Sequence, residues 1–208
     1  MGAEVGKPVS NLGITSMATV TPTIEPKEMT TLNSELKSVA EAKESEFITK
    51  PELDDAVKKS GKFDAADLDI FAKLFTLFDL KGDETVNYKD FLAGLTGCLM
   101  SVTILEKLKF VFGIYDTAGE ELTTRSDLKR CLTAINSVAS FFGDPVLSLA
   151  DIDFITNELF DTITQGNSKT MPMMEMIDML REHDLIKVFA LGEAKIRFGM
   201  PELDPTKQ

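Results

Sequence analysis

The stretch FTLFDLKGDETVNYKDFLAGLTGCLMSVTILEKLKFVFGIYDTAGEE, residues 75–121, carries the pattern that predicts the fold. Twice within it, an apolar helical run ends in an aromatic residue, meets an aspartate, crosses a short polar loop and resumes as a helix. The two aspartates, Asp79 and Asp116, lie 37 positions apart. The stretch therefore predicts two consecutive helix–loop–helix units, with 12-residue loops at 79–90 and 116–127.

The first of these loops is a weakened version of a calcium-binding loop. Such a loop needs oxygen ligands at positions 1, 3, 5, 7, 9 and 12 and a glycine at position 6. Here Lys81 stands at position 3 and Glu84 replaces the turn glycine. A cation about 4 Å from the site costs roughly 4 kcal/mol at an effective dielectric constant of 20, so we expect weak calcium binding at best. The vestigial ligand positions are Asp79, Asp83, Asn87 and Asp90.

The loop 116–127 departs further from the calcium-binding pattern. Ala118 at position 3 removes a ligand, and Glu121 at position 6 replaces the glycine, so the sharp turn is expected to be lost. The sequence therefore predicts a loop that keeps its place between two helices without holding an ion. Its vestigial ligand positions are Asp116, Glu120 and Asp127.

The same frame extends in both directions along the chain. A loop at 41–52 has Lys43 at position 3, and a loop at 161–172 opens with Asp161 but has Pro172 at position 12. Neither supplies the required set of oxygen ligands. We therefore expect four degenerate units that bind no metal, or calcium only weakly.

Helix pairs of this kind can pack without an ion. The residues at the eighth loop positions are expected to form short strands that pair Ile48 with Val86 and Thr123 with Ser168. Apolar stripes on the flanking helices supply the remaining stability. The prediction is a structural scaffold rather than a calcium switch, and calcium titration tests it.

The chain divides into four parts by composition. Residues 1–28 hold three prolines and no helical periodicity, which predicts an extended arm, either disordered or ordered on a partner. Residues 29–100 and 101–192 are each expected to hold one pair of units, the second with a final helix. Residues 193–208 form a polar tail. The fold class is all-α, with two lobes.

Helix starts are marked by capping residues. Thr103 and Glu106 form a capping box, and Ser148 is expected to cap the entering helix of the fourth unit. Asp64 and Asp184 are expected to cap two further helices.

Three clusters have two interpretations each. Phe141 and Phe142, in the connector 140–148, either pack beneath it or contact a partner. The segment MPMMEMIDML, 171–180, holds five of the ten methionines, which favours core packing over a groove that grips a helix. The two cysteines lie at apolar helix positions, so we expect buried thiols rather than a redox pair.

The composition excludes several classes of function. A net charge of −12 argues against nucleic acid and suits cations or basic amphipathic helices. The sequence has neither an apolar run long enough to insert into a membrane nor a secretory leader, so an intracellular location is expected. It also lacks a phosphate loop and a nucleophile elbow, and its single histidine, His183, is expected to be solvated. We therefore do not expect an enzyme.

The chain resembles a known family of EF-hand proteins. The resemblance rests on FTLFDLKGDETVNYKDFLAGLTGCL (75–99), EKLKFVFGIYDTAGEELTTRSDLKRCL (106–132) and ITNELFDTITQGNSKT (155–170), and covers roughly residues 45–192. The chain is similar to calaxin and to the EF-hand subunit of the outer dynein arm docking complex. It is more distantly similar to neuronal calcium sensors and the calcineurin regulatory subunit.

The resemblance implies a two-lobed EF-hand protein of the ciliary or flagellar axoneme. Its expected role is to attach dynein arms to doublet microtubules, with coiled-coil or amphipathic helices of a docking complex and tubulin as partners. The alternatives are a low-affinity calcium sensor that binds a target helix, or a structural protein of the microtubule wall or lumen.

Overall fold

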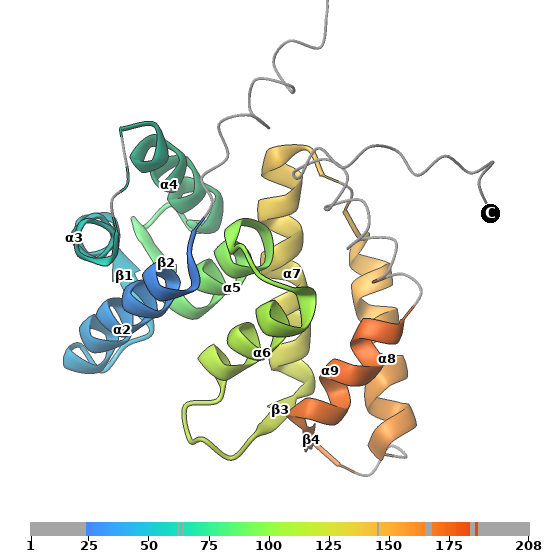
Figure 1. Ribbon diagram of the computed structural model, residues 1–208. Coiled ribbons are helices and arrows are strands. Elements are labelled where there is room, and N and C mark those ends of the chain that lie inside the picture. Colours follow the sequence, from blue (N-terminus) through green and yellow to red (C-terminus); the bar gives the residue numbers. More distant parts are fainter. Residues whose placement is uncertain are drawn as a thin grey trace, which may run out of the picture.

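A computed structural model describes residues 24–61, 63, 65–144, 146–164, 168–183 and 186 of the chain. Within that part the chain forms eight α-helices and four three-residue strands (Figure 1). No described helix is long and apolar enough to cross a membrane. In chain order the elements are α2 (Pro26–Ala42), β1 (Phe47–Thr49), α3 (Lys50–Ser60), α4 (Ala65–Phe78), β2 (Thr85–Asn87), α5 (Tyr88–Leu99), α6 (Ile104–Tyr115), β3 (Leu122–Thr124), α7 (Arg125–Phe142), α8 (Leu149–Thr164), β4 (Thr170–Pro172) and α9 (Met173–Glu182).

Each strand lies between two helices and pairs with a strand of the neighbouring helix pair. β1 and β2 are antiparallel with Ile48 opposite Val86, which confirms the first predicted pairing. β3 and β4 are also antiparallel, but Thr123 faces Met171, so the predicted pairing with Ser168 is wrong. The central residue of every strand is buried.

The fourth loop differs from the prediction because its entering helix is longer. α8 continues through Thr164, and Asp161 lies within this helix instead of opening a loop. The apolar stripe of α8 continues to Ile163, which packs against the core one turn after Leu159. This contact favours one more helical turn and moves the eighth loop position to Met171.

The two predicted lobes share one hydrophobic core. Buried side chains form a cluster that runs through both halves of the chain. At the centre, α5 from the first half packs against α7 from the second (Figure 1). Two glycines of α5 allow the close approach: a Cβ at Gly94 would lie 2.9 Å from the carbonyl oxygen of Ala134, and one at Gly97 would lie 2.6 Å from Cγ1 of Ile135.

The N-terminal helix begins earlier than expected. α2 starts at Pro26, so the last residues of the predicted arm are helical. Ile24 is buried, and its backbone joins the end of α5: its N–H donates to the carbonyl of Leu99, and its carbonyl accepts from the N–H of Ser101. Residues 1–23, the tail 193–208 and, apart from Ile186, the predicted final helix lie outside the described residues.

Two predicted caps are confirmed. The Thr103 hydroxyl accepts from the N–H of Glu106 at 3.3 Å, and the Glu106 carboxylate accepts from Thr103 in return. Ser148 and Asp151 make the same reciprocal contacts at the start of α8. Asp64 and Asp184, also expected to cap helices, lie outside the described residues.

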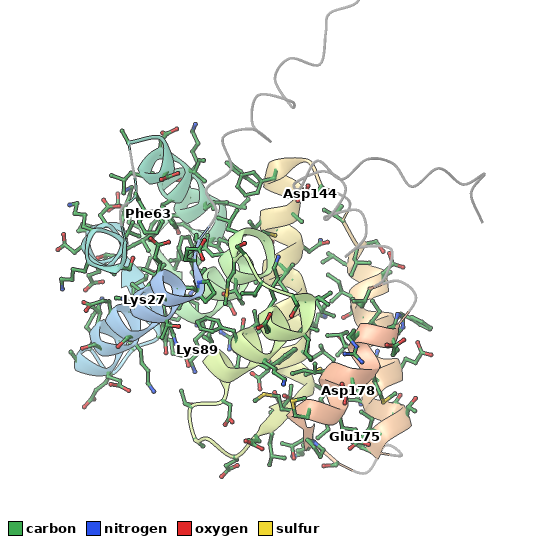
Figure 2. All side chains as sticks on the ribbon, in the orientation of Figure 1. Lys27, Phe63, Lys89, Asp144, Glu175 and Asp178 are labelled. Atoms are coloured by element: carbon green, nitrogen blue, oxygen red, sulfur yellow. The ribbon has the colours of Figure 1, made fainter. Side chains whose placement is uncertain are left out.

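The aromatic connector and the methionine cluster belong to the packed structure. α7 continues through Phe142, which is buried and packs edge-to-face on Phe141, so these residues end a helix rather than form a connector. α9 buries Met173 and Met176, whereas Glu175 and Asp178 point outward (Figure 2). Core packing is therefore the correct interpretation for the buried methionines.

Both cysteines are buried, as expected. The Cys98 thiol donates to the carbonyl of Ile135 at 3.5 Å. Burial raises the pKa of the Cys131 thiol well above its usual range. Both observations agree with packing roles for these thiols.

Candidate functional site

The loops 79–90 and 116–127 keep the backbone of a calcium-binding loop. Glu84 and Glu121, at position 6 of the two loops, adopt the left-handed conformation with φ of 60° and 55°. The expectation that glutamate removes the sharp turn is therefore wrong. The turn persists because a carboxylate at position 1 binds the N–H groups of positions 5 and 6, at 3.1 and 3.0 Å for Asp79 and at 3.1 and 2.8 Å for Asp116.

These left-handed glutamates predict a measurable gain in stability on substitution. A non-glycine residue in this conformation costs about 1–2 kcal/mol. Glycine removes this cost but lowers stability by about 0.4–1 kcal/mol, because it increases the conformational entropy of the unfolded chain. We expect Glu121→Gly to raise the free energy of unfolding by about 0.5–1 kcal/mol. Urea denaturation measures the change. Gly119→Ala, at φ 68° in the same loop, is the matched control and should destabilise; the opposite order would contradict this description.

In the loop 41–52, a lysine ammonium occupies the place of an ion. Nζ of Lys43, at position 3, lies 3.0 Å from Oε2 of Glu52 and 3.4 Å from the carbonyl oxygen of Phe47. These two oxygens belong to positions 12 and 7, both of which are calcium ligands in a functional loop. Lys43 therefore acts as an internal cation for this loop.

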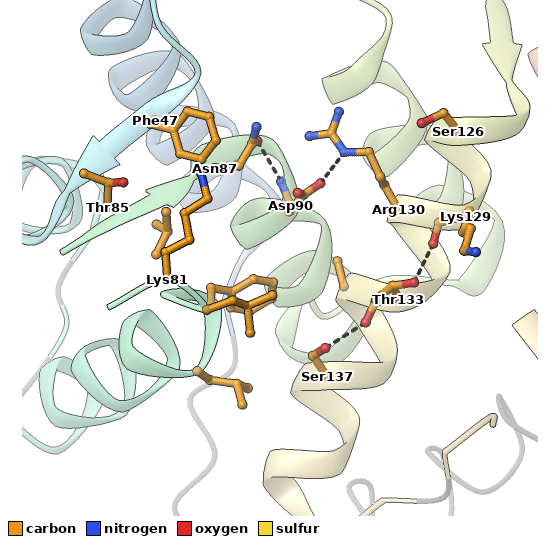
Figure 3. Close-up of a pocket in the computed structure, with 15 residues that line it drawn as sticks. Phe47, Lys81, Thr85, Asn87, Asp90, Ser126, Lys129, Arg130, Thr133 and Ser137 are labelled. Carbon is orange, nitrogen blue, oxygen red and sulfur yellow. Dashed lines mark hydrogen bonds and ion pairs between the residues drawn. The ribbon is translucent and has the colours of Figure 1, made fainter. Parts of the chain in front are cut away.

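In the loop 79–90, the position-12 carboxylate is bound by the second half of the chain. Oδ1 of Asp90 accepts from Nε of Arg130 at 3.0 Å (Figure 3). It also accepts from the Tyr115 hydroxyl at 2.8 Å. The Arg130 guanidinium also lies over the Tyr115 ring, 5.0 Å from its centroid. A carboxylate with these two partners joins α5 to α6 and α7 instead of closing on an ion.

Glu46 extends this network to the first loop. Its carboxylate binds Nζ of Lys89 at 2.6 Å and Nδ2 of Asn87 at 3.0 Å, and Arg130 lies 3.8 Å away. Partial burial raises the pKa of Glu46, but the Lys89 and Asn87 hydrogen bonds and the nearby cations outweigh it, so the pKa lies below its ordinary value of 4.5. The negative charge is therefore part of the folded structure.

This shift predicts an acid dependence of stability. Because the pKa of Glu46 is lower in the folded state, its contribution is present above about pH 4.5 and is lost as the pH falls through the folded-state value. We expect Glu46→Gln to lower stability at pH 7 and to flatten the loss of stability between pH 5 and pH 3. Urea midpoints against pH measure this. Parallel profiles for wild type and Glu46→Gln would contradict the assignment.

Three of the remaining four candidate ligands also have protein partners, whereas Glu120 is exposed. Asp83 accepts from the backbone N–H and the hydroxyl of Thr85, and Asp127 accepts from Thr124 as the helix cap of α7. Asp161 pairs with Nη2 of Arg125 at 2.9 Å. Among the described residues, no three acidic, cysteine or histidine side chains converge as a metal site requires.

His183 was expected to be solvated, and this was wrong. Its side chain is 12 % exposed, and Nε2 lies 3.1 Å from Oε2 of Glu158. The contact places the end of α9 against α8.

A pocket of about 550 Å³ lies beside the Asp90–Arg130 pair (Figure 3). One wall is apolar and comes from β1, the end of α4 and the start of the loop 79–90; the other is the polar face of α7. Sequence patterns do not predict this pocket, because it forms between segments far apart in the chain. The one sequence signal was the exposed apolar Leu80 inside a polar loop.

Comparison with known proteins supports the class of fold. No protein-family model matches this chain. A relative from Dictyostelium discoideum, named calcium-binding protein NCSA, is 33 % identical over 69 residues. The matched region is 33 % of this chain and 37 % of the length of that protein. Together with the paired helix–strand–helix segments, this similarity indicates an EF-hand-like, all-α fold.

Proposed function

We propose that the chain is a non-catalytic scaffold built from four degenerate EF-hand units whose loops keep their shape without calcium. The observation that carries this proposal is the Lys43 ammonium placed between the position-7 and position-12 oxygens of its loop. The binding of Asp90 by Arg130 and Tyr115 supports the same conclusion for the second loop. Such a protein presents its surfaces to partners constantly rather than in response to an ion.

The experiment that tests this function is recovery of partners under controlled calcium. The tagged full chain is purified from its cells in EGTA and in millimolar calcium, and the bound proteins are quantified. The proposal expects the same partners in the same amounts. Recovery that depends on calcium would contradict it.

Within this function, we propose a place in the ciliary or flagellar axoneme, with coiled-coil helices of an outer dynein arm docking complex and the doublet microtubule as partners. The support is the resemblance carried by residues 75–99 and 106–132. The protein is then expected in salt-extracted axonemes, and its depletion should remove dynein arms. An even cytosolic distribution would contradict this location. A position in the microtubule wall or lumen is the structural alternative, and cross-linking in the native assembly distinguishes the two.

A low-affinity calcium sensor is the second candidate. The name of the Dictyostelium relative favours it, as does the calcium-loop backbone kept around Glu84 and Glu121. A sensor must show heat on binding or a change of conformation. Titration calorimetry with millimolar calcium therefore separates it from the scaffold.

A further inference from the structure

The pocket between α4 and α7, here called the seam pocket, has an apolar wall that faces solvent. Phe47 is 42 % exposed, Leu77 36 % and Leu80 91 %, and all three line the pocket. Scattered exposed apolar residues are ordinary, but three around one concave site are typical of a surface that binds a partner. The apolar wall therefore offers a contact area for an apolar side-chain stripe.

The opposite wall is polar and carries hydroxyl groups of α7. The Thr133 hydroxyl donates to the carbonyl of Lys129 at 2.8 Å, and the Ser137 hydroxyl donates to the carbonyl of Thr133 at 2.9 Å. These hydroxyls are thus satisfied within their own helix, and Lys129, Thr133 and Ser137 follow one another along α7 beside the pocket (Figure 3). A pocket with one apolar and one polar wall matches an amphipathic helix better than a wholly apolar ligand.

The charges of the seam pocket have the opposite sign to the chain as a whole. Three cations line it, Lys81, Lys129 and Arg130, against the single carboxylate of Asp90, although the net charge of the chain is −12. Arg130 is already bound to Asp90. Lys81 instead lies over the Phe47 ring at 5.2 Å, at the edge of the apolar wall. Cations therefore outnumber carboxylates in the lining, although Glu46 and Asp153, outside it, also contact Arg130 and Lys129.

Lys129 can exchange its present partner at little cost. It pairs with Asp153, and both side chains are about half exposed. Exposed ion pairs of this kind contribute only about 0–1 kcal/mol. A partner carboxylate can replace that of Asp153 without breaking the packed structure.

We propose that the seam pocket binds an acidic amphipathic helix of a partner protein. Its apolar stripe packs on Phe47, Leu77 and Leu80, and its carboxylates pair with Lys81 and Lys129. This differs from the basic helices that the net charge alone suggests. The proposal rests on the scaffold function and assigns one of its surfaces.

The test uses two fluorescent 18-residue peptides with the same leucine and phenylalanine stripe, one with glutamate and one with lysine at the polar positions. Binding to the full chain in EGTA is followed by fluorescence anisotropy. The glutamate peptide should bind, and the double variant Lys81→Glu, Lys129→Glu should weaken its binding at least tenfold. Leu80→Asp should abolish it. The lysine peptide should not compete for the same site.

The matched control is Leu149→Asp. Leu149 is 70 % exposed at the start of α8, outside the lining of the seam pocket, so this variant should bind the glutamate peptide as wild type does. Circular dichroism confirms that each variant is folded.

The assignment would be overturned by no binding of the glutamate peptide, by binding that survives Leu80→Asp, or by competition from the lysine peptide. A dimer in sedimentation that Leu80→Asp dissolves would assign the pocket to a second copy of the chain and would also overturn it. Each of these leaves the scaffold function standing, because recovery of native partners in EGTA is measured separately.

Discussion

Replacing Phe91 with alanine is expected to lower the free energy of unfolding by about 3–5 kcal/mol. Phe91 lies in α5 with no exposed surface, and its ring packs edge-to-face on Phe78 at 5.6 Å between centroids. Truncation removes the transfer free energy of the ring and leaves a cavity that the surrounding helices fill only partly. Urea or thermal denaturation in EGTA measures the loss.

The matched control is a substitution at a position that binds calcium in a functional loop. Glu120→Ala removes an exposed side chain at position 5 of the loop 116–127 and keeps its backbone contact with Asp116. We expect a change within about 0.5 kcal/mol. If apolar packing rather than ion coordination holds the fold, the first variant must be far the more damaging. Comparable losses would contradict this.

Gly97→Ala is expected to lower the free energy of unfolding by about 2–3 kcal/mol. The new Cβ would lie 2.6, 2.9 and 3.0 Å from three side-chain carbons of Ile135 on α7. Ile135 is buried and β-branched, so its side chain has little freedom to move away. The strain would push apart the two helices that join the halves of the chain.

Two further variants show whether the clash is the cause. Combining Gly97→Ala with Ile135→Ala should destabilise by about 1–3 kcal/mol less than the sum of the single changes. Gly113→Ala, in α6 with open space around its Cα, should instead stabilise by up to about 1 kcal/mol through helix propensity. Additive losses, or a loss at Gly113 equal to that at Gly97, would contradict the packing described for α5 and α7.

The sequence was sufficient for the features that depend on local pattern. Loop spacing placed three of the four strands, because Ile48, Val86 and Thr123 each occupy the buried centre of a strand at the eighth loop position. Capping residues predicted the starts of α6 and α8, because the Thr103 and Ser148 hydroxyls accept hydrogen bonds from residues only three positions ahead. These features require no knowledge of distant contacts.

The errors arose where tertiary contacts decide the conformation. Ile163 extends α8 because its side chain reaches the core. Counting loop positions along the sequence cannot reveal this contact. The error at Glu121 has a local cause instead: the carboxylate of Asp116, five positions earlier, accepts from its N–H and keeps the left-handed turn. The partners of Asp90 are distant in sequence: Arg130 lies 40 positions after it and Tyr115 lies 25 positions after it. Spacing alone therefore could not predict these contacts.

The most direct test of the central claim is the thermal unfolding midpoint of the full chain in EGTA and in 1 mM calcium, with magnesium as the control. A site with a dissociation constant of about 10 μM would add about 2.7 kcal/mol at this concentration, which raises the midpoint by roughly 5–11 °C for a chain of this size. The structure predicts a change of less than about 1 °C, because Lys43, Tyr115 and Arg130 already bind the position-12 carboxylates of the first two loops. A rise of several degrees that calcium causes and magnesium does not would contradict the claim that the fold is complete without the ion.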